Sequence, residues 1–157
     1  MAIQMNIGDH ISPEAGFIAV PNKHRAAVNW ARARAKIIVR DMPAADRYFA
    51  TLPGGRSLAS LLGDSTIWIN FNPGMAGFGE QSVAHNNEIA IGPAAFRVGR
   101  WTVLATLVHE LAHVDGAPGG ADRRAEEALL RCGLGKWSEH TTGRDDPGTP
   151  YDPTISG

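Results

Sequence analysis

The stretch best suited to chemistry in this 157-residue chain is HELAH, which places two histidines four positions apart. On a helix, positions i and i+4 share a face, so His109 and His113 can offer two imidazole nitrogens to one metal ion. Glu110 points about a quarter of a turn away, where its carboxylate can reach a water molecule beside the metal. The pattern predicts a hydrolytic centre in which the metal lowers the pKa of water and Glu110 accepts the proton.

Two ordinary core histidines on an apolar helix would give the same pattern. The residues TVLATLV before the motif and LAHV through it do favour a buried helix. Buried imidazoles and a buried carboxylate need partners, however, and a metal ion supplies them. We therefore expect a metal centre on this helix.

HELAH in an apolar helix resembles the HExxH signature of the zincins, a class of zinc metallopeptidases. The resemblance covers about residues 65–132. In thermolysin-like zincins an edge strand and its hairpin partner come just before the active-site helix, and QSVAH, NN and EIAIG stand in that place here. The resemblance implies a zinc-dependent endopeptidase whose edge strand, residues 82–85, holds an extended peptide substrate across the metal.

The motif leaves the third metal ligand open. Astacin-like and matrixin-like metzincins continue as HExxHxxGxxH, but this chain has Gly119 where their last histidine stands. Gluzincins and ImmA/IrrE-type peptidases instead take an acidic residue from the next helix. In this chain the resemblance then implies Asp122, Glu126 or Glu127.

Among these acids, Glu126 is the expected ligand because it shares a side of its helix with apolar leucines, whereas Glu127 can pair with Arg131. Asp122 is equally suited to cap the helix or to support the site from behind. Asp115, two positions after the second histidine, can either orient a ligand histidine or lie at the surface.

Peptide hydrolysis also needs a donor where negative charge develops on the carbonyl oxygen. Zincins often take it from a tyrosine, histidine or arginine outside the motif helix. Tyr151, which lies between two prolines, is our first choice, and His140, Arg144 and His85 are the alternatives.

The helices and strands that must position these residues can also be predicted from the sequence, and they indicate one α+β domain over residues 1–157. We expect N-terminal helices packed on a small mixed sheet with an antiparallel edge hairpin, followed by the motif helix, a ligand-bearing helix and an irregular tail. The expected helices cover residues 23–40 (capped by Asn22), 43–50, 56–63, 92–99, 100–116 and 123–133; the strands cover 65–71 and a hairpin turning at Asn86-Asn87; the tail is 135–157.

Composition limits the classes of partner that this chain can bind. A formal net charge of −1 argues against nucleic acid as a partner, so the arginines of the first helix are expected on its solvated face. No apolar run reaches membrane-spanning length, and the N-terminal segment lacks the basic-then-apolar order of residues that a signal peptide has.

A single cysteine, Cys132, excludes an internal disulfide framework and is expected in the core. We expect a cytoplasmic protein, or one exported without a cleavable signal.

The expected partner is therefore a peptide or protein substrate. The chemistry does not separate a housekeeping peptidase from a delivered effector. The alternative function is a zincin-like binding or scaffold domain without catalysis, although a purely structural metal site has no use for Glu110.

Overall fold

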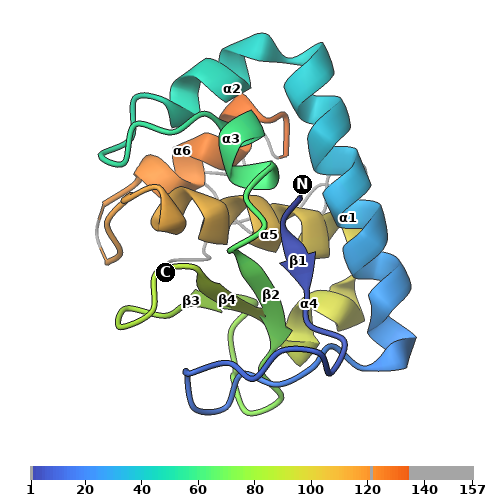
Figure 1. Cartoon of the computed structure of the whole chain (residues 1–157). Coiled ribbons are helices and arrows are strands. Elements are labelled where there is room, and N and C mark those ends of the chain that lie inside the picture. Colours follow the sequence, from blue (N-terminus) through green and yellow to red (C-terminus); the bar gives the residue numbers. More distant parts are fainter. Residues whose placement is uncertain (1, 121, 135–157) are drawn as a thin grey trace.

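Four short strands form one mixed sheet in the computed structural model, which describes residues 2–120 and 122–134 (Figure 1). The strand order is β1-β2-β4-β3, and the first three strands run parallel while β3 pairs antiparallel with β4 at one edge. The strands are β1 (Gln4–Met5), β2 (Trp68–Phe71), β3 (Gly79–Gln81) and β4 (Glu88–Ile91).

Six helices complete the described part of the chain, which makes it an α+β fold as expected. They are α1 (Asn22–Asp41), α2 (Pro43–Phe49), α3 (Leu58–Leu62), α4 (Pro93–Val98), α5 (Arg100–Val114) and α6 (Arg124–Arg131). None of the helices in this part of the chain is long and apolar enough to cross a bilayer.

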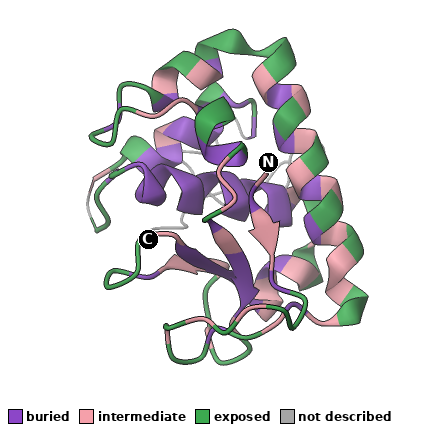
Figure 2. Ribbon diagram, viewed as in Figure 1, coloured by how far each residue is buried: buried purple, intermediate pink, exposed green. Residues whose placement is uncertain are grey.

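Helix α5 is the centre of the packing. It contacts α1, α4 and α6 as well as strands β3 and β4. Every residue from Thr102 to Val114 is buried, and Figure 2 shows the helix enclosed by the other elements. A helix that is apolar all round is stable only in such an enclosed place, because it has no face to present to water.

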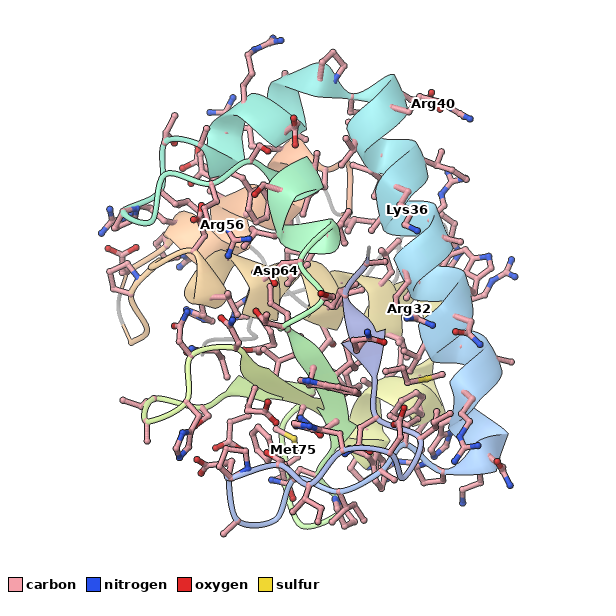
Figure 3. All side chains as sticks on the ribbon, viewed as in Figure 1. Arg32, Lys36, Arg40, Arg56, Asp64 and Met75 are labelled. Atoms are coloured by element: carbon pink, nitrogen blue, oxygen red, sulfur yellow. The ribbon has the colours of Figure 1, made fainter. Side chains whose placement is uncertain are left out.

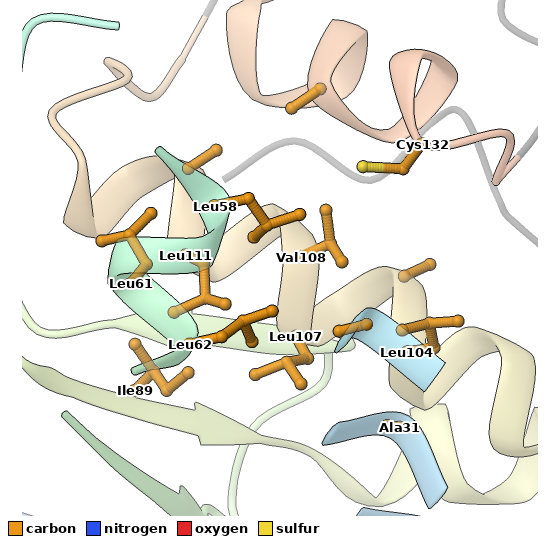
Figure 4. Close-up of a cluster of buried hydrophobic side chains, with 14 of the residues drawn as sticks. Ala31, Leu58, Leu61, Leu62, Ile89, Leu104, Leu107, Val108, Leu111 and Cys132 are labelled. Carbon is orange, nitrogen blue, oxygen red and sulfur yellow. The ribbon is translucent and has the colours of Figure 1, made fainter. Parts of the chain in front are cut away.

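Helices α1 and α3 each bury an apolar face in the core around α5. In α1 the buried positions recur at helical spacing and include Ala31 and Ala35, whose small side chains let the two helices approach closely. In α3 the buried positions are Leu58, Leu61 and Leu62, which lie beside the leucines of α5 (Figure 4).

Cys132 also lies in this core, as expected from the sequence. Burial raises the pKa of its thiol to about 12, so the sulfur stays protonated and acts as an apolar group.

The start of α1 differs from the prediction. Asn22 is the first helical residue rather than the cap, and Pro21 occupies the cap position without a side-chain hydrogen bond. Proline presets the backbone angle φ that this position adopts here, −59°, and its carbonyl accepts from the amide of His24.

The edge hairpin also differs. The edge strand is residues 79–81, which overlaps the predicted stretch QSVAH only at Gln81, and the predicted strand 82–85 is part of the connection to β4. A buried Ser82 turns the chain, because its hydroxyl accepts from the amide of His85 and donates to Glu14. The turn at Asn86-Asn87 is confirmed, because the amide of Glu88 donates to the carbonyl of His85 at 2.9 Å across these two residues. None of the described non-glycine residues has a positive φ, so the turn forms without a left-handed asparagine.

The central position of α5 yields a test of the core. We expect Leu107→Ala to lower the free energy of unfolding by about 2–5 kcal/mol, because a fully buried leucine leaves a cavity when truncated. Val83→Ala is the control, since Val83 is 98% exposed and its truncation should change stability by less than about 0.5 kcal/mol. Urea unfolding followed by circular dichroism measures both. Equal effects would show that Leu107 is not in the core.

Candidate metal centre

The motif residues all lie within the buried part of α5. His109, Glu110 and His113 are 0%, 1% and 7% exposed, respectively. The helix ends just after them at Gly116, whose φ of 88° is left-handed and favours glycine. This end was predicted from the sequence and is confirmed.

The two histidines turn the same nitrogen toward each other. His109 Nε2 and His113 Nε2 are 3.1 Å apart. His113 Nδ1 lies 2.7 Å from the carbonyl oxygen of Ala117, and because a carbonyl only accepts, Nδ1 must carry the hydrogen. The neutral His113 ring therefore has its lone pair on Nε2, the atom that faces His109.

His109 makes one hydrogen bond fewer than His113 does. Its Nδ1 is buried without a hydrogen-bond partner among the described residues. Burial, and secondarily the nearby His113, lower the pKa of His109 to about 3, so its imidazole is neutral at physiological pH. Imidazole nitrogens of this kind bind transition metals.

Glu110 lies against the edge strand. A Cβ built on Gly79 of β3 would be 3.0 Å from Glu110 Oε1 and 2.4 Å from Thr106 Cγ2, so the strand backbone packs directly over this part of α5. The other carboxylate oxygen of Glu110 is buried without a partner among the described residues. Burial first, and then the charges of Glu80 and Glu126, raise the pKa of Glu110 well above its usual range.

Glu126 approaches the same region from α6, which packs on α5. It is 3% exposed, and its Oε2 has no partner among the described residues. Burial raises the pKa of its carboxyl group, while His113 is one of the groups that lower it. Its charge therefore acts on both Glu110 and His113.

The three expected ligands are not assembled as a finished site. Within residues 2–120 and 122–134, no group of three histidine, cysteine, aspartate or glutamate side chains is placed to hold a metal ion. The structure brings the two histidine nitrogens together, and Glu126 lies close enough to His113 for that residue to lower the pKa of its carboxyl group.

The other two candidate acids have partners of their own. Glu127 accepts from Arg131 at 2.9 Å, as expected from the sequence. Asp122 accepts from the backbone amide of Arg124 at 3.0 Å and from its guanidinium at 2.9 Å, so it holds the start of α6. Neither carboxylate is free for a metal in this arrangement.

Asp115 has a structural role that the sequence left undecided. It is fully buried, its Oδ1 accepts from the amide of Arg56, and its carbonyl accepts from the amide of Gly54. It therefore ties the segment between α2 and α3 to the end of α5. The carbonyl of Ala117, not Asp115, orients the ring of His113.

Of the four candidates for the donor to the carbonyl oxygen, only His85 lies among the described residues. His85 is exposed in the connection between β3 and β4. Tyr151, His140 and Arg144 lie outside the described residues.

Two residues next to Glu110 were missed in the sequence. Gly79 and Thr106 form the contact between β3 and α5. A glycine within a strand often marks a close approach of two backbones, which is the signal that could have identified Gly79. Thr106 carried no such signal, since its hydroxyl simply donates to the carbonyl of Thr102 one turn earlier.

Comparison with known proteins finds no matching family model, no similar curated protein and no similar solved structure. The function therefore rests on the chemistry of the site.

The contact between β3 and α5 can be tested directly. We expect Gly79→Ala to destabilise the fold by about 1–3 kcal/mol, because the new methyl group would overlap Thr106 Cγ2. Thr106→Ser removes that methyl group and keeps the hydroxyl, so the double variant should recover part of the loss.

Gly77→Ala is the matched control, because no atom lies within 4 Å of a Cβ built there. The measurement is chemical denaturation of the four proteins and the parent. Additive losses in the double variant would contradict the close approach of β3 to α5.

Proposed function

We propose that this chain is a zinc-dependent endopeptidase of the zincin type. The observation that carries the proposal is the pair of Nε2 atoms, 3.1 Å apart on a buried helix that also carries the partnerless carboxylate oxygen of Glu110. The proposed metal ligands are His109, His113 and Glu126. Glu110 is the proposed general base.

The residue types fit zinc. Two imidazole nitrogens and one carboxylate are a common ligand set of catalytic zinc sites, which keep a further position open. The hydrogen bond from His113 Nδ1 to Ala117 leaves Nε2 free to bind, as expected for a ligand histidine held from behind. The buried, partnerless oxygen of Glu126 is the available third donor.

Zinc, when bound, would supply a Lewis acid that polarises a peptide carbonyl and lowers the pKa of water. Glu110 would accept the proton of the attacking water and pass it to the leaving amine. The enclosing α5 core and β3 would keep bulk water from this carboxylate. Tyr151 remains the proposed donor to the carbonyl oxygen, with His140, Arg144 or His85 as alternatives.

The edge strand supports a peptide substrate. Strand β3 is the last strand of the sheet, and only β4 pairs with it among the described residues. A peptide in extended form can add to such a strand through backbone hydrogen bonds. Because Gly79 packs against Glu110, this peptide would pass next to the proposed base. The location proposed for the enzyme is the cytoplasm, or outside the cell after export without a cleavable signal.

A second candidate is a zincin-like binding or scaffold domain. It is favoured by one observation, the lack of an assembled group of three ligands within the described residues. Metal binding and turnover separate the two candidates.

Metal binding tests the ligand set. We expect about one zinc per chain after purification without added metal, measured by elemental analysis. His113→Ala should lose the metal. Glu126→Gln should weaken zinc affinity by at least about 100-fold in competition with a chelator, because it removes a ligand.

Glu127→Gln is the matched control for Glu126, since it changes the neighbouring residue of the same helix, whose carboxylate pairs with Arg131. Its zinc affinity should equal that of the parent. A parent protein that takes up no zinc even when zinc is supplied would overturn the proposed function.

Catalysis tests Glu110 separately. Glu110→Gln should keep the bound zinc but lower the rate of cleavage of a mixed peptide library by about 100-fold to 10,000-fold, because the amide cannot accept the proton. The readout is mass spectrometry of the products beside the zinc content of the same sample. Zinc binding without cleavage by the parent would favour the scaffold candidate.

A further inference from the structure

A second site lies at the other edge of the sheet from β3. A groove of about 460 Å³ runs between the start of the chain, at Ala2 and Ile3, and the side of α1 that carries Arg32 and Lys36. Figure 3 shows both cations on the part of α1 next to β1. The groove volume falls in the range of small-molecule sites. Since β1 and β3 are the two outer strands, this groove is separate from the candidate metal centre.

The groove combines an apolar surface with two positive charges. Ile3, Ala33 and Ile37 contribute apolar side chains. Arg32 and Lys36 are one helical turn apart and therefore lie along the same wall. None of the described residues that line the groove is acidic.

Arg32 is held in place without an acidic partner. Its Nη1 donates to the carbonyl of Ile3 at 2.9 Å, and its Nη2 donates to the side chain of Asn29. Its Nε is buried and has no partner among the described residues. Burial lowers the pKa of this guanidinium, since no carboxylate offsets the loss of solvation.

Among the described residues, only one of the cations of α1 has an ion pair: Arg40, further along the helix, pairs with Asp41. In the part of the chain that the structure describes, no carboxylate pairs with Arg32 or Lys36. Two like charges at this spacing repel each other unless an anion lies between them.

From these observations we infer that the groove binds a small organic anion. A carboxylate or phosphate group would accept hydrogen bonds from Lys36 and Arg32, and a short apolar part would cover Ile3, Ala33 and Ile37. The small volume and the presence of only two cations favour a small molecule over a nucleic acid or a membrane surface, which engage many cations at once. This inference does not depend on the proposed peptidase activity.

The test uses the full chain and amide NMR with three probes. Hexanoate carries the charge and the apolar part, hexanamide is its neutral counterpart, and inorganic phosphate is the charged group alone. We expect hexanoate to give saturable shifts at residues 2–3 and 29–37 with a Kd of about 1 mM or tighter. Phosphate should shift the same residues more weakly, and hexanamide should leave them unchanged.

Variants of Lys36 complete the test, because this side chain is exposed and its replacement leaves the core intact. Lys36→Gln should weaken hexanoate binding about fivefold, and Lys36→Glu should abolish it. Lys23→Gln, an exposed position of the same helix outside the groove, should bind as the parent does.

The inference would be overturned by any of three results. These are no shift with hexanoate, equal binding of hexanamide, and unchanged binding by Lys36→Glu. Equal binding of hexanamide would mean that the groove selects apolar groups without regard to charge.

Discussion

A helix buried on all sides must satisfy its polar side chains from within the protein, and this constraint on α5 organises the whole structure. Thr106 meets it by bonding back to Thr102, His113 by bonding to Ala117, and Asp115 by bonding to Arg56. The atoms of α5 that still lack a partner among the described residues include His109 Nδ1 and Glu110 Oε2, both in the motif. Asp115 Oδ2, just past the end of α5, also lacks a partner among the described residues, so two of these three atoms lie where chemistry is proposed.

The surroundings of α5 follow from the same constraint. Helix α1 packs on it, the leucines of α3 lie beside its own leucines (Figure 4), and β3 reaches it through Gly79, the residue type that adds no side chain. Helix α6 covers it too but brings a carboxylate, Glu126, into the interior. Two acids buried near each other, Glu126 and Glu110, are unfavourable as charged groups, and a metal ion would offset this cost.

Sequence patterns predicted the elements with strong periodicity and the motif that α5 carries. The end of α5 at Gly116, the strand at residues 68–71 and the inward position of Glu126 all follow from local residue types. The edge strand did not, because Gly79 belongs to it through pairing with Ile91 of β4 and through the close packing of its backbone on Thr106, neither of which is a local property of the residue. The role of Asp115 was undecided for the same reason, since its partners belong to a loop far earlier in the chain.

The bonds of Asp115 also have a consequence for how the chain folds. They join residues 59 positions apart, so the end of α5 is complete only after the segment near Arg56 has returned to it. Contacts between distant parts of the sequence slow folding because a long loop must close first. They also make the two parts unfold together. The C-terminal end of the motif helix should therefore exchange its amide hydrogens by the same cooperative opening as the loop at Gly54, rather than by fraying from its own end.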